Sequence, residues 1–306
     1  MHRYLLVPLA LLVLLAGACA RKEESRPTRT IGVTLLTRAH LFYRDLEDGL
    51  REAAAGAGFE LIVASADFDL GRQVSQVEDF LARGVDAIVI CPVDSKGVGP
   101  AIKEANRAGI PVFTADIAAQ EGDVVAHVAS DNLAGGRLAG EYLAEALHGK
   151  GSVAIINQPA ISSVLDRVQG FKEAVGRYPG LKVVADVNGQ GVRDRAMQVA
   201  ADVLQSQPGL NGIFGINDDS ALGALDAVRQ FNRTGIVIVG YDATPPAREA
   251  ILKETALRAD VVQNPKKIGS TTIDIIRRHF AGEPVPKVVP VEVTVIGKAD
   301  LWKEGK

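Results

Sequence analysis

Short apolar runs alternate with helix-like segments along almost the whole 306-residue chain, and this alternation constrains the fold most strongly. Early examples of such runs are TIGVTLL from Thr30 and DAIVICP from Asp86. Runs of this kind are typical of parallel strands buried on both faces, with the intervening helices acting as crossovers. The sequence therefore predicts an α/β protein with parallel sheets.

The alternation passes through two similar halves, and the second half begins near Ser152 with SVAIINQ. About ten strands and nine helices are predicted in total. The run IPVFTAD is followed directly by the run VVAHVASD, which breaks the strict alternation of a closed eightfold barrel. Two Rossmann-like lobes therefore fit better, and the barrel is the structural alternative.

The first residues have a different character. Arg3 is followed by the apolar run Leu5 to Leu15, by small residues and by Cys19. The run is short for a membrane span and is typical of a secretory signal. The small residues before Cys19 resemble a bacterial lipoprotein cleavage site, so we expect a signal peptide over 1–19 and lipidation of Cys19. A plain signal peptide or a short anchor helix is the alternative, and the charged segment 20–29 reads as a flexible tether.

The composition and the absence of common motifs argue against several function classes. The net charge of −3 offers no basic face for nucleic acid. Cys19 and Cys91 are the only cysteines, so we expect no disulfide and no cysteine-rich metal site. The sequence contains no HExxH, GxSxG or phosphate-loop motif, and we expect no metal and no cofactor. Asp116 and Asp242 could form a glycosidase acid pair, but the predicted fold does not suit that chemistry.

Polar residues gather where the predicted strands end, which is where ligands bind to parallel α/β sheets. Most are carboxylates and amides, groups that hydrogen-bond to neutral hydroxyls. They are Thr37, His40, Asp67, Asp69, Asp94, Asp116, Asn157, Gln158, Asn188, Gln190, Asn217, Asp218, Asp219, Asp242, Gln263 and Asn264. Phe42 and Tyr43 lie in a predicted loop before a helix that starts at Asp45, where they could cover the apolar face of a sugar ring. Alternatively, one or both pack against that helix.

Longer motifs in this sequence resemble the periplasmic sugar-binding proteins of ABC importers, close to the ribose-binding branch. The motifs are TIGVTLLTRAHLFYRDLEDGLREAA, FLARGVDAIVICPVDSKGVGPAIKEANRAGIPVFTAD, HVASDNLAGGRLAGEYLAE, GIFGINDDSALGALDAV and IVIVGYDATP. The resemblance implies a Venus flytrap of the periplasmic binding protein-like I class, with two α/β lobes joined by three hinge crossings. It places an N-terminal lobe over 30–130 plus 262–290 and a C-terminal lobe over 131–261 plus 291–306.

The same resemblance implies a set of ligand-binding residues between the lobes. They are His40, Phe42, Tyr43, Asp116, Arg167, Asn217, Asp242 and Gln263, with Gln190 added as a possible replacement contact. Three positions depart from the ribose-binding pattern, since Ile117 and Leu165 stand where that branch has arginine and Gly191 where it has an aromatic residue. Ribose is therefore not implied as the ligand, and Gln158 and Arg193 are further candidate replacements.

These features together predict a non-catalytic receptor for a monosaccharide, either a pentose or a hexose, or for a related polyol. The resemblance implies an ABC permease and its ATPase as partners, a monomeric receptor, and attachment to the membrane only through lipidated Cys19, in the periplasm or at the cell surface. A sensory or quorum-signal receptor that feeds a chemoreceptor or kinase is the alternative. A repressor of the lactose type would need a DNA-binding domain before Thr30, where the sequence predicts a signal and a tether.

Overall fold

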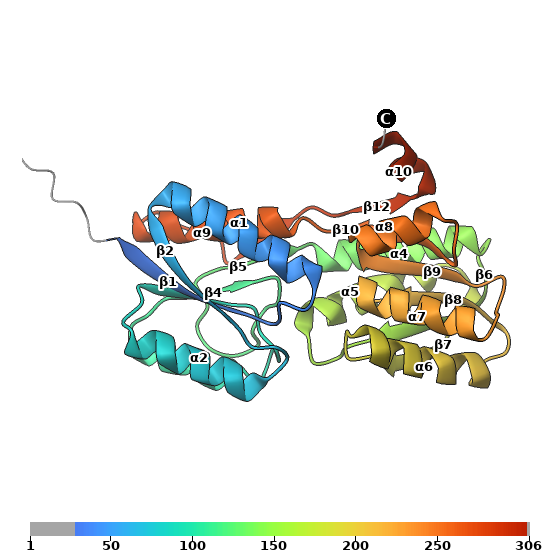
Figure 1. Ribbon diagram of the computed structural model, residues 1–306, viewed down its shortest axis with the longest axis horizontal. Helices are drawn as coiled ribbons and strands as arrows, with labels where there is room; N and C mark the ends of the chain where they lie inside the picture. Colours follow the sequence, from blue (N-terminus) through green and yellow to red (C-terminus); the bar gives the residue numbers. More distant parts are fainter. Residues whose placement is uncertain (1–27, 305–306) are drawn as a thin grey trace, which may run out of the picture.

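The structure is a computed structural model that describes residues 28–304, so Cys19 and the predicted signal peptide lie outside the described residues. It contains two six-stranded sheets, each covered by helices on both faces, which form two lobes side by side (Figure 1). This arrangement confirms the predicted fold class. No helix within the described residues combines the length and the apolar character that a membrane crossing requires.

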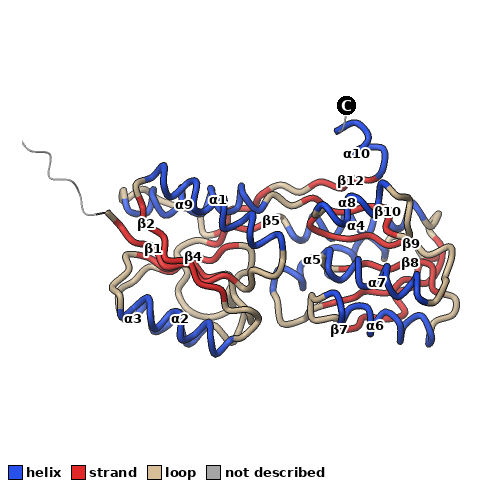
Figure 2. Tube along the Cα trace, in the orientation of Figure 1, coloured by secondary structure: helices blue, strands red, loops and turns tan. Residues whose placement is uncertain are grey.

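The N-terminal lobe is built on a fully parallel sheet with the strand order β11-β5-β4-β3-β1-β2. Its strands are β1 (Arg29–Leu35), β2 (Phe59–Ser65), β3 (Ala87–Ile90), β4 (Val112–Ala115), β5 (His127–Ser130) and β11 (Val288–Val291). Its helices are α1 (Leu41–Ala57), α2 (Leu70–Ala82), α3 (Gly99–Arg107) and α9 (Pro265–Phe280). Helices α1 and α9 pack together on one face, and α2 and α3 cover the other (Figure 2).

The C-terminal lobe has the sheet order β12-β10-β9-β8-β6-β7, in which only β12 is antiparallel to its neighbour. Its strands are β6 (Lys150–Asn157), β7 (Gly180–Asn188), β8 (Leu210–Gly215), β9 (Val237–Asp242), β10 (Leu257–Val262) and β12 (Thr294–Gly297). Its helices are α4 (Asn132–Ala146), α5 (Ser162–Val175), α6 (Arg193–Ser206), α7 (Asp218–Gln230), α8 (Pro245–Leu252) and α10 (Lys298–Glu304). Helices α4 and α5 form one packed pair, and α6 and α7 form another.

The chain passes between the two sheets three times: after β5, after β10 and between β11 and β12. The last passage divides the apolar run VVPVEVTVI, which would be taken from its local pattern alone as a single strand. Its first part pairs with β5 in the N-terminal lobe and its second part pairs with β10 in the C-terminal lobe. Glu292 and Val293 connect the two parts, so one apolar run serves both lobes.

Helix α1 begins four residues before the predicted start at Asp45, and this moves Phe42 and Tyr43 out of the expected loop. Both side chains lie in the first turn of the helix and are buried. No polar cap in the sequence marks this start, because His40 occupies the N-cap position without a side-chain capping bond. The aromatic pair is therefore held by helical backbone, which fixes its direction more firmly than a loop would.

The glycine pair in α4, Gly135 and Gly136, allows close packing. A Cβ atom at Gly136 would lie 2.0 Å from the carbonyl oxygen of Arg167, and one at Gly135 would lie 2.2 Å from the hydroxyl of Tyr241. No larger residue fits at either position without moving α5 or β9. The close approach of α4 to α5 and to the ring of Tyr241 fixes the part of α5 that carries Arg167.

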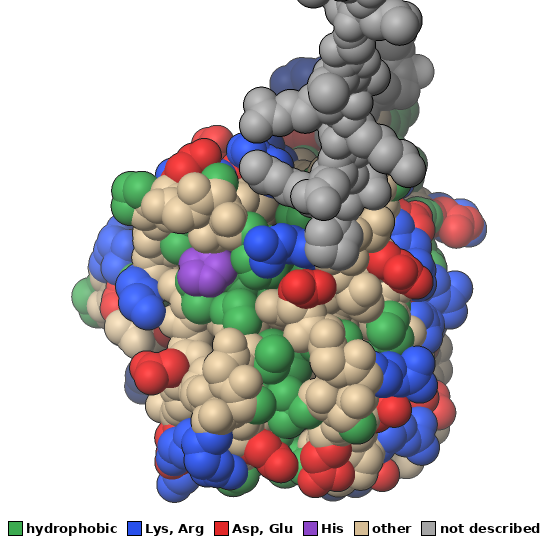
Figure 3. All heavy atoms as spheres, turned by 90° about the vertical axis from the view of Figure 1, so that its left-hand side faces the viewer, with side chains coloured by type: hydrophobic (Ala, Val, Ile, Leu, Met, Phe, Trp, Pro, Cys, Tyr) green, Lys and Arg blue, Asp and Glu red, His purple; other side chains and the backbone are tan. Residues whose placement is uncertain are grey.

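The surface of the N-terminal lobe shows a mixed charge distribution. Acidic and basic side chains are interspersed over the end of this lobe that faces away from the C-terminal lobe (Figure 3). Charged side chains of this lobe also pair locally, as in the ion pairs of Glu47 with Arg38 and Arg51. Mixed charges of this kind favour solubility and give no long-range attraction of a single sign.

Candidate ligand-binding site between the lobes

A small cavity lies between the lobes, where the carboxyl ends of strands from both sheets meet, and it offers about 40 Å³ of space to the centre of a water molecule. Eight of the nine ligand residues named from the sequence line it. They are His40, Phe42, Tyr43, Asp116, Arg167, Asn217, Asp242 and Gln263. The other lining residues are Leu36, Ile117, Gln158, Ile161, Ser163, Val164 and Ile216. A confined cavity with polar and apolar lining of this kind suits a small molecule rather than a peptide or nucleic acid.

The N-terminal lobe contributes a carboxylate held by a phenol. The hydroxyl of Tyr43 donates a hydrogen bond of 2.7 Å to Asp116 Oδ2. Asp116 Oδ1 is buried and receives no hydrogen bond from the described residues, so it is available to a ligand hydroxyl. Burial raises the pKa of Asp116, whereas the positive charge of Arg167 and the bond from Tyr43 oppose that shift. Burial and the charge of Asp116 raise the pKa of Tyr43 well above its usual range, so the phenol remains a donor.

The C-terminal lobe contributes a fixed cation. Arg167 on α5 is 5% exposed and donates from Nε to Asn132 Oδ1 and from Nη1 to the carbonyl oxygen of Ile216, each over 2.8 Å. Its guanidinium carbon lies 3.9 Å from the centre of the Tyr241 ring, which adds a cation–π contact. Neither hydrogen bond uses Nη2. Because the planar group is held from three sides, it is oriented before any ligand arrives.

A short chain of hydrogen bonds connects two hinge crossings to a carboxylate in the cavity. Ser130, at the end of β5, donates to Gln263 Oε1 over 2.6 Å. Gln263, just after β10, donates from Nε2 to Asp242 Oδ1 over 2.6 Å. Asp242 lies at the end of β9 with a φ of 119°, a strained backbone for a residue with a side chain. Asp242, which lines the cavity, is therefore linked to the hinge crossings by direct hydrogen bonds.

Behind Asp242 lies a buried acid pair, Asp218 and Asp260. Asp218 accepts from the backbone N–H of Thr244 over 2.6 Å, and Asp260 accepts from that of Ala243 over 3.0 Å. Their remaining buried oxygens, Asp218 Oδ1 and Asp260 Oδ2, receive no N–H or O–H from the described residues, while the two carboxyl groups contact each other. Two buried carboxylates in contact cannot both carry charge, so the pair holds a proton.

The pKa values of this cluster agree with a shared proton. Burial raises the pKa of Asp218 to about 6, and hydrogen bonds from Asp260 and Thr244 oppose the shift. Burial and the charge of Asp218 raise the pKa of Asp260 and of Asp242 well above the usual range. The sequence analysis missed Asp260, which follows Ala259 inside β10. Its only signal was a single acid within the run LRADVVQ.

His40 lies where the two lobes meet. Its Nε2 is 3.3 Å from Oδ2 of Asp219 on α7, and its ring contacts the rings of Tyr43 and Phe68. Burial lowers the pKa of His40, while the charge of Asp219 and a contact with the backbone of Gly191 oppose the shift. The imidazole is therefore neutral at neutral pH.

Four further hydrogen bonds cross from one lobe to the other. The backbone N–H of Ser95 donates to the carbonyl oxygen of Ala160, and that of Ser162 donates to Ser95 Oγ over 3.0 Å. Ser162 Oγ in turn donates to the carbonyl oxygen of Ala118 over 3.0 Å and accepts from its N–H over 3.1 Å. Ser95 and Ala118 belong to the N-terminal lobe, and Ala160 and Ser162 to the C-terminal lobe. The lobes are thus held together across the cavity.

Gln190 is the one named residue that does not line the cavity. It is exposed, and its φ of 59° belongs to a turn in which its N–H donates to Asn188 Oδ1. The adjacent Gly191 instead contacts a residue that lines the cavity, with its carbonyl oxygen accepting from Asn217 Nδ2 over 3.0 Å. A Cβ at Gly191 would lie 2.3 Å from Gln158 Oε1, so an aromatic residue at this position would displace Gln158. Of the other two candidate replacements, Gln158 lines the cavity, whereas Arg193 pairs with Asp226 outside it.

The expectation that Leu165 marks a lost arginine contact is wrong. Leu165 is 41% exposed and does not line the cavity, whereas Arg167 two positions later does. Two steps along a helix turn a side chain by about 200°, so neighbours at this spacing point to opposite faces. Only the departure at Ile117 changes the cavity wall, because Ile117 lines it.

Most of the hydrogen-bonding capacity of the Asn217 side chain is used within the protein. It caps α7, where its Oδ1 accepts from the N–H of Ser220 over 2.9 Å. Its amide donates to Gly191, so only one N–H remains for a ligand. The carboxylates Asp116 and Asp242 and the cation Arg167 are therefore the stronger polar groups of the cavity.

Two lobes, three crossings and a polar cavity between them define the class of binding proteins that close around a small solute. The family model described as the periplasmic binding protein domain matches residues 31–284, and the chain belongs to this family. Members of this family are substrate-binding proteins of transport systems. The predicted family is confirmed, and membership places the protein in the periplasm.

Individual relatives agree with this assignment. The chain is 34% identical over 271 residues to the ribose import binding protein RbsB of Salmonella typhimurium, covering 88% of this chain and 90% of that protein. It is 32% identical over 238 residues to the xylitol-binding protein of Mycolicibacterium smegmatis, covering 77% of this chain and 67% of that one. An ABC transporter solute-binding protein from Agrobacterium vitis, solved with bound α-D-tagatopyranose, aligns with a TM-score of 0.85 at 30% identity, covering 90% of this chain and 96% of that chain.

Proposed function

We propose that this protein is the substrate-binding component of an ABC importer and that it binds a monosaccharide, either a pentose or a hexose, or a related polyol. The observation that carries the proposal is the buried Oδ1 of Asp116, an acceptor without a partner among the described residues, which lines the cavity between the lobes together with Arg167 and Asp242. Acceptors and donors of this kind bind hydroxyl groups. Relatives named for ribose and xylitol, and one solved with tagatose, support the same class of ligand.

The two half-sites explain how binding is converted into a signal. Asp116 and Tyr43 belong to one lobe, and Arg167, Asn217 and Asp242 belong to the other. A ligand that contacts both sets stabilises only the closed form and shifts the population toward it. An ABC permease with its ATPase would then recognise the closed surface, and no step requires covalent chemistry. The proposal also includes a monomeric receptor anchored by lipidated Cys19 on the periplasmic or outer cell surface.

A thermal-shift screen of the chain without residues 1–19 tests the proposal. Pentoses, hexoses and polyols are added singly, because a ligand that binds only the folded state raises the melting temperature. We expect at least one clear shift, and we expect Asp116→Asn to weaken binding of that ligand roughly 10- to 100-fold, the scale of one charged hydrogen bond. Asp67→Asn, at another strand end outside the cavity, is the matched control and should leave the shift unchanged. If none of the carbohydrates shifts the transition, the proposal fails.

A further inference from the structure

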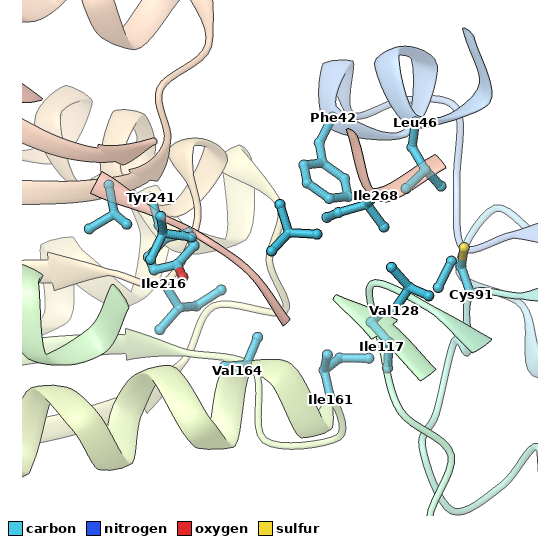
Figure 4. Packing of buried hydrophobic residues seen from close by; sticks show 14 of the residues in the cluster. Phe42, Leu46, Cys91, Ile117, Val128, Ile161, Val164, Ile216, Tyr241 and Ile268 are labelled. Carbon is cyan, nitrogen blue, oxygen red and sulfur yellow. The ribbon is translucent and has the colours of Figure 1, made fainter. Parts of the chain in front are cut away.

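One wall of the cavity is aliphatic. It is formed by Ile117, which follows β4 of the N-terminal lobe, and by Ile161 and Val164 at the start of α5. The three side chains are 2%, 2% and 4% exposed, and they belong to a single buried apolar cluster that continues across the cleft. Figure 4 shows Ile117 and Ile161 facing each other across the lobe boundary, with Val164 beside them.

The strong polar groups come from other positions in the fold. Asp116 and Asp242 follow strands of the two sheets, and Arg167 lies one helical turn beyond Val164. Ser163, the polar neighbour of the wall, is four residues before Arg167 and therefore shares its side of α5. The cavity thus combines two carboxyl groups and a guanidinium with a patch of hydrocarbon that has no polar side-chain atom of its own.

This division has a direct consequence for a carbohydrate. A hydroxyl placed against Ile117, Ile161 and Val164 would lose its hydrogen bonds to water and find no partner in the wall. A methyl or methylene group in the same place would leave water and gain apolar contact. Phe42 also lines the cavity and offers an aromatic surface to the face of a sugar ring. The aliphatic wall is a second apolar surface in addition to that ring.

We propose that the site selects a monosaccharide that lacks a hydroxyl on one edge, such as a deoxy sugar, and that this edge packs against Ile117, Ile161 and Val164. The inference rests on the proposed carbohydrate-binding function and narrows it. It assigns the selectivity to residues from both lobes, so discrimination occurs only when the cleft closes.

Titration calorimetry with matched pairs tests the inference. The pairs are L-fucose with L-galactose, D-fucose with D-galactose, L-rhamnose with L-mannose, and 2-deoxy-D-ribose with D-ribose, each differing by one hydroxyl. We expect at least one deoxy sugar to bind at least about 10-fold more tightly than its partner, the scale on which an apolar pocket discriminates. The inference is wrong if the hydroxylated member is equal or better in every pair that binds. If none of these sugars binds but another carbohydrate from the thermal-shift screen does, the selectivity inference fails and the proposed function stands. If no carbohydrate binds at all, both fail.

A variant locates the discrimination. Val164→Thr keeps the shape of the side chain and adds a hydroxyl to the wall, so we expect the deoxy preference to fall about 10-fold. Val168→Thr makes the same change one turn later on α5, at a buried position that does not line the cavity, and should keep the preference. Ile117→Thr repeats the test from the other lobe if Val164→Thr does not fold. An unchanged preference in a folded wall variant would overturn the inference.

Discussion

The two lobes build their halves of the site in different ways. The N-terminal half relies on one carboxylate, Asp116, which is held by the phenol of Tyr43 among apolar neighbours. The C-terminal half concentrates charge, with the Asp218–Asp260 pair behind Asp242 and the buried cation Arg167 beside it. The N-terminal half buries one ionisable group away from water. The C-terminal half buries several, and each of them needs a hydrogen bond or an opposite charge to compensate for the lost water. The C-terminal half is consequently the more costly and the more firmly oriented of the two.

The charges of the two halves also act on each other across the cleft. Arg167 opposes the effect of burial on the pKa of Asp116, although the two residues belong to different lobes. It has the same effect on Asp242 within its own lobe. The guanidinium of Arg167 therefore opposes the rise in the pKa of both carboxyl groups. We expect the loss of unfolding free energy to differ between variants of the two halves.

Removing the cation should produce the largest effect. Arg167→Met keeps much of the apolar stem but leaves Asp116 and Asp242 without their common positive charge, so we expect a loss of about 3–5 kcal/mol of unfolding free energy at pH 7. Urea denaturation measures it. Arg193→Met is the control, because that arginine is paired outside the cavity and 45% of its side chain is exposed, and it should cost less than about 1 kcal/mol. Equal costs in the two variants would mean that Arg167 is not needed to compensate the buried carboxylates.

We expect the free energy of unfolding to fall at acid pH because of His127 in the N-terminal lobe. Burial lowers the pKa of His127 from 6.5 to about 4, opposed by a hydrogen bond with Thr114. The unfolded chain binds a proton between these values and the folded one does not, so stability falls as the pH falls from about 6.5 to about 4. His127→Asn removes that group, and we expect it to recover roughly 2–3 kcal/mol relative to the wild type over this window. Urea denaturation at several pH values measures the difference.

The histidine test also has a matched control. His148→Asn changes an exposed histidine, and its curve should run parallel to that of the wild type. If His127→Asn also runs parallel, His127 titrates at its ordinary pKa in the folded protein.

Elements are predicted best from sequence where local chemistry marks one of their ends. The start of helix α9 is marked in this way, because Asn264 caps it and Pro265 occupies its first turn. Helix α1 was predicted too short because no polar cap marks its start, and burial in the tertiary structure decides it instead. Strands β11 and β12 could not be separated from local pattern, since both belong to one apolar run and only their partners differ.

The same limit applies to the site. Asp116 and Asp242 were accessible to sequence reasoning because they follow apolar strands, and the structure places both on the cavity. Asp260 was not, because its role depends on its register opposite Gly240, where a Cβ would lie 2.4 Å from Asp260 Oδ2. Leu165 was misjudged because alignment of a motif does not reveal which face of a helix a residue occupies. Local sequence thus located the strand ends, while helix rotation and strand register decided which side chains meet.

The smallest of these effects, opposite in sign to that of His127, should come from the acid pair in the C-terminal lobe. Burial raises the pKa of Asp218 from 3.8 to about 6, so the folded protein binds more protons than the unfolded chain between these values. Stability contributed by this proton is present at low pH and is lost as the pH rises from about 4 through about 6.

Asp260→Asn supplies a permanent N–H in place of the shared proton, while its carbonyl oxygen can still accept from Ala243. We therefore expect the variant to lose roughly 1–2 kcal/mol less than the wild type across this window and to be the more stable protein at pH 7. Asp45→Asn, on the exposed face of α1, controls for the change in net charge. A wild-type protein that is as stable as the variant at pH 7 would show that the pair carries no such proton. The contrast between an N-terminal lobe that is destabilised as the pH falls and a C-terminal lobe that is destabilised as the pH rises from about 4 to about 6 would then be lost.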